Sequence, residues 1–256
     1  MSDPVSAGTT EDAVLGGRLT LRQPRRGHRA GHDAILLAAA TGATAGAHAV
    51  DLGAGVGAAG LALAARVPGL AVTLVEIDAK LVKLAAHNVA RNGLAERARA
   101  VLLDVAAPAR LYAAAGLPAG CAGHVLMNPP FNDPARSNAS PDAGKRLAHV
   151  ATGEGLAPWL RAADRLLAPG GTLTLIWRAD GLAAVLGALA RFGSVAVLPV
   201  HPRPDTPAIR ILVRAIKGGR APLTLFPALI LADAEGAPTP QAEAVLRQAG
   251  GLPLAG

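Results

Sequence analysis

The tetrapeptide Asn128-Pro129-Pro130-Phe131 combines residue types that could bind and activate a planar amine. It follows the apolar run at 124–127, which is typical of a buried strand. Proline lacks an N–H and fixes φ, so the sheet cannot continue and the backbone carbonyls stay available as acceptors. Hydrogen bonds from an exocyclic amine to the Asn128 oxygen and the Pro129 carbonyl would localise the nitrogen lone pair, while Phe131 stacks on the planar group.

Such positioning favours methyl transfer to nitrogen, which needs no strong general base. The alternative is a proline-rich turn with Phe131 packed in the core. We therefore predict a catalytic turn made of Asn128, Pro129, Pro130 and Phe131.

A glycine-rich segment upstream could hold the methyl donor. Residues 51–60 read Asp-Leu-Gly-Ala-Gly-Val-Gly-Ala-Ala-Gly, and glycines let the backbone turn sharply and approach a ligand. Glu76, at the end of the next predicted strand, could accept hydrogen bonds from ribose hydroxyls. The spacing also satisfies the dinucleotide fingerprint, so it allows NAD(P) as well. Asp51, Asp104 and the tetrapeptide favour S-adenosylmethionine instead.

We predict cofactor contacts at the ends of the first four core strands. The candidates are Asp51, Gly53, Gly55, Gly57, Glu76, Ile77, Asp104, Val105 and Asn128. Asp51 could alternatively bond the amides of the loop. Asp78 is more typical of a helix N-cap than of a ligand.

The elements that must position these residues alternate between short apolar strands and longer helical stretches, which indicates βαβ units and a parallel sheet. We predict strands at 47–52, 71–76, 98–103, 124–128, 171–177, 194–199 and 209–215. Helices are expected from Asp33 to residue 40 and at about 58–67, 78–92, 108–115, 156–168 and 180–192. The proline-rich link at 200–208 is too short for a crossover helix, so the last two strands should pair antiparallel.

This order predicts an α/β, Rossmann-like, mostly parallel seven-stranded sheet with an antiparallel C-terminal pair and helices on both faces, the layout of the class I methyltransferase fold. We expect one domain at 15–220, with an N-terminal segment and first helix at 15–46 and a core at 47–220. Residues 1–14 should be disordered, because they are small, polar and aperiodic. Residues 15–24 read as a short hairpin or edge segment, and 221–256 as a tail over the sheet edge with a short helix at about 240–249.

Composition limits the setting of the protein. No apolar run approaches the ~20 residues needed to cross a bilayer, and the polar start is unlike a signal peptide. The single cysteine, Cys121, fits a reducing cytosol and excludes a cysteine-based zinc site. We expect a cytoplasmic, metal-free protein with no membrane partner, and the sequence indicates no oligomeric state.

The formal net charge of +7 points to an anionic partner, with nucleic acid the first candidate. Arginine-rich composition from a GC-rich genome is the alternative. Two basic segments could hold phosphates around an extruded base, and we predict RNA contacts from Arg25, Arg26, Arg29, Arg136, Lys145 and Arg146.

These motifs resemble the N-methyltransferases with an Asn-Pro-Pro-aromatic signature, and most closely the bacterial tRNA1(Val) adenine-N6 methyltransferase family. The resemblance covers roughly 15–220, and it includes Asn88 and Asn92-Gly93-Leu94. It implies S-adenosylmethionine, methylation of adenine-N6 in a tRNA next to the anticodon, and cofactor contacts from Gly31, His32 and Asp33. His32 stands where the family usually has Thr. Ribosomal-RNA guanine-N2 and protein-glutamine N5 methyltransferases share the signature, and an idle RNA-binding relative is the non-enzyme alternative.

Overall fold

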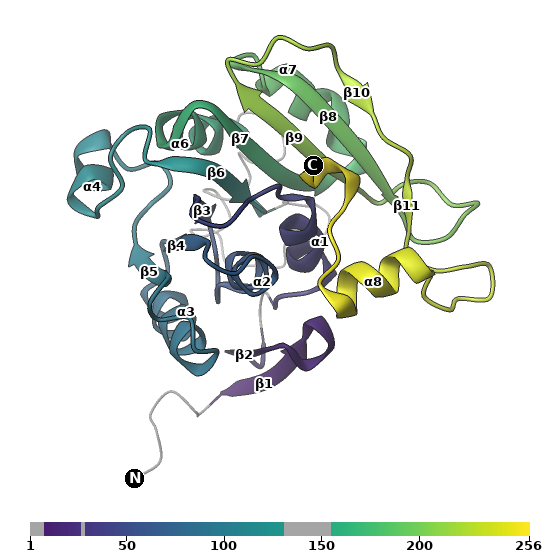
Figure 1. The fold of residues 1–256 in the computed structure, drawn as a ribbon, viewed down its shortest axis with the longest axis horizontal. Coiled ribbons are helices and arrows are strands. Elements are labelled where there is room, and N and C mark those ends of the chain that lie inside the picture. Colours follow the sequence, from purple (N-terminus) through teal and green to yellow (C-terminus); the bar gives the residue numbers. More distant parts are fainter. Residues whose placement is uncertain (1–7, 27–28, 131–154) are drawn as a thin grey trace, which may run out of the picture.

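The computed structural model describes residues 8–26, 29–130 and 155–256 as an α/β domain (Figure 1). Its strands are β1 Thr9–Val14, β2 Leu19–Pro24, β3 His48–Leu52, β4 Ala71–Glu76, β5 Ala98–Leu102, β6 Ala122–Met127, β7 Leu167–Arg178, β8 Phe192–His201, β9 Arg210–Lys217, β10 Thr224–Leu225 and β11 Leu229–Ile230. Its α-helices are α1 His32–Ala40, α2 Ala58–Arg66, α3 Ala79–Arg91, α4 Ala109–Ala114, α6 Leu156–Leu166, α7 Leu182–Ala188 and α8 Pro240–Gln248. Short 3-10 turns are η1 Leu15–Gly17, η2 Ala179–Gly181 and η3 Pro253–Ala255.

The main sheet has the predicted topology. Within the described residues its strand order is β10-β8-β9-β7-β6-β3-β4-β5, and β11 also pairs with β8. Strands β3 to β7 run parallel, whereas β9 lies antiparallel to both β7 and β8. The class I methyltransferase fold and its antiparallel C-terminal pair are therefore confirmed.

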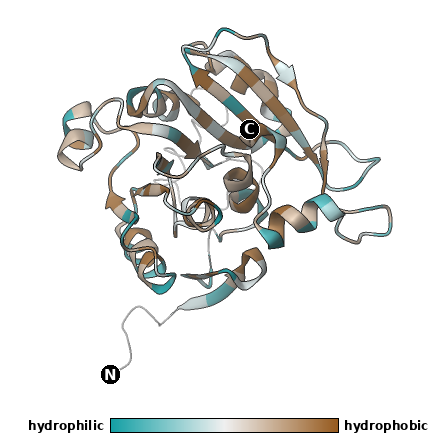
Figure 2. Cartoon of the chain, in the orientation of Figure 1, coloured by the Kyte–Doolittle hydropathy of each residue, from teal (hydrophilic) through white to brown (hydrophobic). Residues whose placement is uncertain are grey.

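Alternating side chains build a core on each face of the sheet. On β9, Ile211 and Val213 enter one core with α6 and α7, while Leu212 enters the other with α1 and α2. Figure 1 shows these helices on opposite sides of the sheet, and Figure 2 shows β8 and β9 as largely hydrophobic. Helices cover both faces, as predicted, so the ends of the strands are left to form a site.

The expectation that 1–14 is disordered is wrong for residues 9–14, which form β1 and pair antiparallel with β2. The polar side chains of β1 have partners: Glu11 forms ion pairs with Arg22 and Arg91, and Asp12 pairs with Arg29. The polar composition of this segment was therefore not a sign of disorder, because its side chains are paired with arginines from later parts of the chain. Residues 1–7 lie outside the described part.

The C-terminal tail contributes to the fold more than predicted. Strands β10 and β11 add two short parallel segments to β8, beyond the seven strands expected. The predicted helix at about 240–249 is α8, capped by the Thr239 hydroxyl. After α8, Leu252 and Leu254 are buried in the core that contains α1.

Candidate active site

A cavity of about 270 Å³ lies at the carboxyl ends of β3 and β6, beside the N-terminus of α1. Its walls come from residues 29–34, the glycine loop after β3 and Asn128. Seven of the predicted cofactor residues line it: Gly31, His32, Asp33, Asp51, Gly53, Gly55 and Asn128. Strand ends next to a glycine-rich turn are where α/β proteins bind ligands.

The three glycines of the loop all have left-handed backbone conformations, with φ of +68° at Gly53, +57° at Gly55 and +89° at Gly57. Their surroundings differ. A Cβ on Gly57 would meet Leu74 at 2.8 Å, whereas a Cβ on Gly55 would have no neighbour within 4 Å. Gly57 thus packs the loop onto the sheet, and Gly55 faces open space where a ligand can approach the backbone.

Asp51 is almost fully buried at the end of β3, where its Oδ2 accepts a hydrogen bond of 2.8 Å from the Gly60 N–H. Burial raises its pKa to about 7, opposed by the Gly60 hydrogen bond and reinforced by the negative charge of Glu76. The structural role is thus present, since Asp51 bonds the Gly60 amide in the first turn of α2. Asp51 also lines the cavity, and its contact with the cofactor stays a prediction.

Glu76 ends β4 and organises the loop from outside the cavity. Its Oε2 accepts from the Gly55 N–H at 2.8 Å, and its Oε1 accepts from the N–H groups of Ile77 and Asp78 at 2.8 and 2.9 Å. Because a carboxylate oxygen has two lone pairs, Oε2 keeps one acceptor position for a further donor. The predicted N-cap is confirmed, since Asp78 accepts from Lys80 N at 2.7 Å.

The other predicted cofactor residues gather at the neighbouring strand end. Leu102, the last residue of β5, is in register with Glu76, so Asp104 lies close to the same edge. Asp104 accepts from Ala106 N at 2.8 Å, and Ile77 is 59% exposed. The Val105 carbonyl accepts from Tyr112 Oη at 2.9 Å. Gly57, Glu76, Ile77, Asp104 and Val105 do not line the 270 Å³ cavity.

The tetrapeptide begins where β6 ends, next to the glycine loop. Leu52 is paired with Met127 in the parallel register of β3 and β6, so Gly53 and Asn128 leave the sheet side by side. Asn128 is partly exposed into the cavity, Pro129 is buried and Pro130 is exposed. Phe131 lies outside the described residues, as do Arg136, Lys145 and Arg146.

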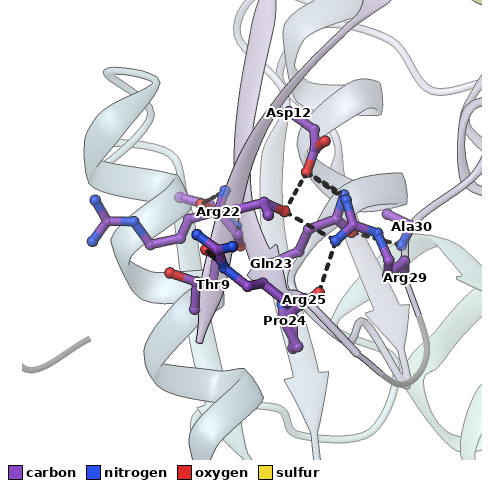
Figure 3. A network of polar contacts seen from close by, with 10 residues as sticks. Thr9, Asp12, Arg22, Gln23, Pro24, Arg25, Arg29 and Ala30 are labelled. Carbon is purple, nitrogen blue, oxygen red and sulfur yellow. Dashed lines mark hydrogen bonds and ion pairs between the residues drawn. The ribbon is translucent and has the colours of Figure 1, made fainter. Parts of the chain in front are cut away.

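The three N-terminal arginines predicted to contact RNA differ in how far their side chains are free to bind a phosphate. Arg25 and Arg26 are exposed, although Arg25 Nε donates to the Thr9 carbonyl at 3.0 Å. The Arg29 guanidinium bonds to Thr10, Asp12 and the Pro24 carbonyl (Figure 3). Asp12 of β1 thus neutralises Arg29, although the segment 25–29 contains no acidic residue of its own.

The first turn of α1 is fixed by an ion pair across the domain. Asp33 Oδ2 accepts from Nε of Arg210, at the start of β9, at 2.9 Å. His32 begins the helix and lines the cavity next to Asp33. The segment that the family resemblance assigned to the cofactor therefore does border the cavity.

Sequence reasoning missed three residues around this site. Trp159 of α6 lies against Gly53, where an added Cβ would come within 2.4 Å of its ring. Asp12 and Gln23 hold the segment that precedes α1. The only signal for Trp159 was its rarity in a chain with two tryptophans.

A mostly parallel sheet with an antiparallel C-terminal pair and a glycine loop at the carboxyl end of β3 defines an S-adenosylmethionine-dependent methyltransferase of class I. The model of the methyltransferase small domain family matches residues 32–198, and the chain belongs to that family. No curated protein matches the chain in sequence.

Solved structures agree with this class. A predicted O-methyltransferase from Agrobacterium tumefaciens is 33% identical, with a TM-score of 0.73 over 86% of this chain and 98% of that one. TrmN from Thermus thermophilus is 22% identical, with a TM-score of 0.51 over 72% of this chain and 47% of that one. An O-methyltransferase from Thermotoga maritima is 18% identical, with a TM-score of 0.53 over 77% and 69%. The last two similarities concern the fold alone.

Membrane-spanning helices and clusters of metal ligands are both absent from the residues that the structure describes. None of their helices has the length and apolar character of a membrane span. They also contain no group of three or more His, Cys, Asp or Glu side chains arranged to bind a metal.

Proposed function

We propose that the protein transfers a methyl group from S-adenosylmethionine to an exocyclic amine of RNA, with adenine-N6 of a tRNA next to the anticodon as the first candidate. The observation that carries the proposal is the position of Asn128, which lines the cavity beside the glycine loop and begins the Asn-Pro-Pro-Phe turn. The bound cofactor supplies an electrophilic methyl group.

The residues around the cavity fit that cofactor. Gly55 leaves its backbone open to a ligand, and the buried carboxyl group of Asp51 gives a polar wall. Gly31, His32 and Asp33 would bind at the α1 side. Ribose hydroxyls would use the free acceptor position of Glu76, and the adenine would lie between Ile77 and the Asp104–Val105 segment.

The turn would bind the acceptor amine. The Asn128 side-chain oxygen and the Pro129 carbonyl accept its two N–H groups, which turns the nitrogen lone pair towards the methyl group. Phe131 would stack on the base. Fixed acceptors at a reacting nitrogen lower the barrier by orientation and electrostatics, so no strong base is required.

RNA as the substrate is supported by the net charge of +7 and by the exposed Arg25 and Arg26. Arg136, Lys145 and Arg146 follow the catalytic turn in sequence and would add phosphate contacts. Arg29 has a weaker claim, because its guanidinium is bonded within the hairpin. A cytoplasmic location fits both an RNA substrate and the single cysteine.

A second candidate is methylation of a hydroxyl, since the 33% identical Agrobacterium relative is described as a predicted O-methyltransferase. The Asn-Pro-Pro-Phe turn favours a nitrogen acceptor over a hydroxyl. Its two hydrogen-bond acceptors, the Asn128 side-chain oxygen and the Pro129 carbonyl, match the two protons of an amine rather than the single proton of a hydroxyl.

A transfer assay with methyl-labelled S-adenosylmethionine tests the proposal on bulk tRNA, rRNA and protein. Wild type should label tRNA, and Asn128→Ala should label it about 100-fold more slowly, a typical effect of removing one fixed hydrogen-bonding group. Leu225→Ala, on an exposed residue of β10, is the control and should match wild type. Equal rates for Asn128→Ala and wild type would contradict the role of Asn128. Label found in rRNA alone, in protein glutamine or on a hydroxyl would contradict tRNA amines as the substrate and would identify the labelled molecule as the substrate instead.

A further inference from the structure

The segment 29–31 forms one wall of the cavity, and it is held by the N-terminal hairpin of β1 and β2. The Arg29 guanidinium donates to Thr10 Oγ1 at 2.9 Å, to the Pro24 carbonyl at 2.9 Å and to Asp12 Oδ2 at 2.8 Å. The Ala30 N–H donates to Gln23 Oε1 at 2.9 Å. Both the side chain and the backbone of the wall are therefore attached to the hairpin (Figure 3).

Asp12 is the residue on which these contacts converge. One of its oxygens, Oδ2, accepts from Arg29, from Gln23 Nε2 at 2.9 Å and from Thr10 Oγ1 at 2.9 Å. The Gln23 amide, together with Thr10 and Arg29, holds the pKa of the Asp12 carboxyl below its usual value against a desolvation effect of burial. The carboxylate is thus the form that organises the network.

Through Gln23, Asp12 also influences the backbone of Ala30. Gln23 is buried, and its amide has one orientation that satisfies both neighbours: Nε2 towards Asp12 and Oε1 towards the Ala30 N–H. Without the acceptor at Asp12, the amide loses the partner that selects this orientation, and the Ala30 N–H loses a defined acceptor.

We propose that Asp12 is a positioning residue for the cofactor cavity: it orients the Arg29 guanidinium directly and the Ala30 backbone through Gln23, and so fixes the wall that leads into α1. Asp12, Gln23 and Thr10 are the side chains of the hairpin that would then act on the cavity wall. The inference rests on the proposed function, in which this cavity holds S-adenosylmethionine.

Glu11 provides a matched control. It is the neighbour of Asp12 on β1 and carries the same charge, but its ion pairs go to Arg22 and Arg91, at 3.0 and 2.8 Å, rather than to a residue of the cavity wall. Glu11→Ala therefore removes one negative charge and the ion pairs of the same hairpin, as Asp12→Ala does. It leaves the hydrogen bonds to segment 29–31 in place.

Calorimetry with S-adenosylhomocysteine tests the proposal on wild type, Asp12→Ala, Asp12→Asn and Glu11→Ala, with urea unfolding of each ligand-free protein. Asp12→Ala should bind about tenfold more weakly than wild type, and Glu11→Ala within about twofold, although both lose similar stability. Asp12→Asn keeps an acceptor oxygen and should recover about half of the loss in binding free energy. Equal affinities for Asp12→Ala and Glu11→Ala would overturn the positioning role.

A further variant separates this inference from the cavity assignment. Gly55→Asn places a side chain into the open space, and asparagine tolerates the left-handed backbone found there. If Gly55→Asn loses binding and Asp12→Ala does not, only the positioning role fails. If Gly55→Asn binds S-adenosylhomocysteine as wild type does, the cavity is not the cofactor site. The proposal that this cavity holds S-adenosylmethionine is then wrong, and the positioning role of Asp12 is wrong as well.

Discussion

The side-chain amide of Asn88, in the last turn of α3, donates a hydrogen bond to the carbonyl of Val56 in the glycine loop at 2.9 Å. The same side chain accepts from the Arg22 N–H at 2.7 Å and donates to the Arg22 carbonyl at 3.0 Å. One turn later, Asn92 makes the same pair of bonds with Thr20. Asn88 and Asn92 thus bond to the outer edge of β2 as a neighbouring strand would, and Asn88 joins the β1–β2 hairpin to the glycine loop.

Asn88→Ala should therefore destabilise the protein and weaken cofactor binding together. Asn88 is completely buried, so the backbone groups of Arg22 and Val56 would lose their partners away from water. We expect a loss of about 3 kcal/mol in the free energy of unfolding, measured in urea. Asn92→Ala should lose less, because Asn92 is partly exposed and water can replace its amide. Equal losses for the two variants would contradict this account of α3.

Gly53 and Gly55 form a matched pair for testing how the loop packs. Alanine at either position must adopt a left-handed φ, but only at Gly53 would its Cβ come within 2.4 Å of Trp159. We expect Gly55→Ala to lose about 1 kcal/mol from backbone strain and Gly53→Ala about 2 kcal/mol more from overpacking. Urea unfolding measures both, and indistinguishable variants would show that Trp159 does not restrict Gly53.

Asp51 should make the stability of the ligand-free protein depend on pH. Its pKa is raised from 3.8 to about 7 on folding, so the folded state binds a proton that the unfolded state lacks between these values. Stability is greatest below pH 3.8 for this group and falls until about pH 7, by on the order of 4 kcal/mol.

The variant Asp51→Asn removes this titration and keeps an acceptor for the Gly60 N–H. It should be more stable than wild type at pH 8, and the difference should narrow as the pH falls from 7 towards 4. Thermal unfolding across that range measures the difference. A constant difference between variant and wild type would show that Asp51 does not titrate there.

Local patterns in the sequence were enough to predict the main strands, the antiparallel last pair and the glycine loop, because each strand, turn and cap is determined within a few residues. Asp78 was recognised as an N-cap and Asn128 as a strand end for this reason. The hairpin at 9–24 was only partly recognised, since Asp12 gains its order from Arg29 and Asn88 lies on a distant helix. The contact between Gly53 and Trp159 also joins distant segments, and no local spacing encodes it.

The tail after α8 should be required for stability. Leu254 is completely buried against the core that contains α1, and the Arg214 guanidinium donates to its carbonyl at 2.8 Å. Leu254→Ala should lower the free energy of unfolding by about 3 kcal/mol, as for other buried leucines. Leu225→Ala, at a leucine that is 67% exposed in the same tail, should change it by less than about 0.5 kcal/mol. Equal effects would mean that the tail is not part of the core.

The most direct test of the central claim is mass spectrometry of nucleosides from tRNA and rRNA of a strain that lacks this protein. We predict that one N6-methyladenosine disappears from a tRNA, at the position next to the anticodon. Expression of the wild-type protein should restore it, and expression of Asn128→Ala should not. An unchanged set of amine-methylated nucleosides in both RNA classes, or full restoration by Asn128→Ala, would contradict the account.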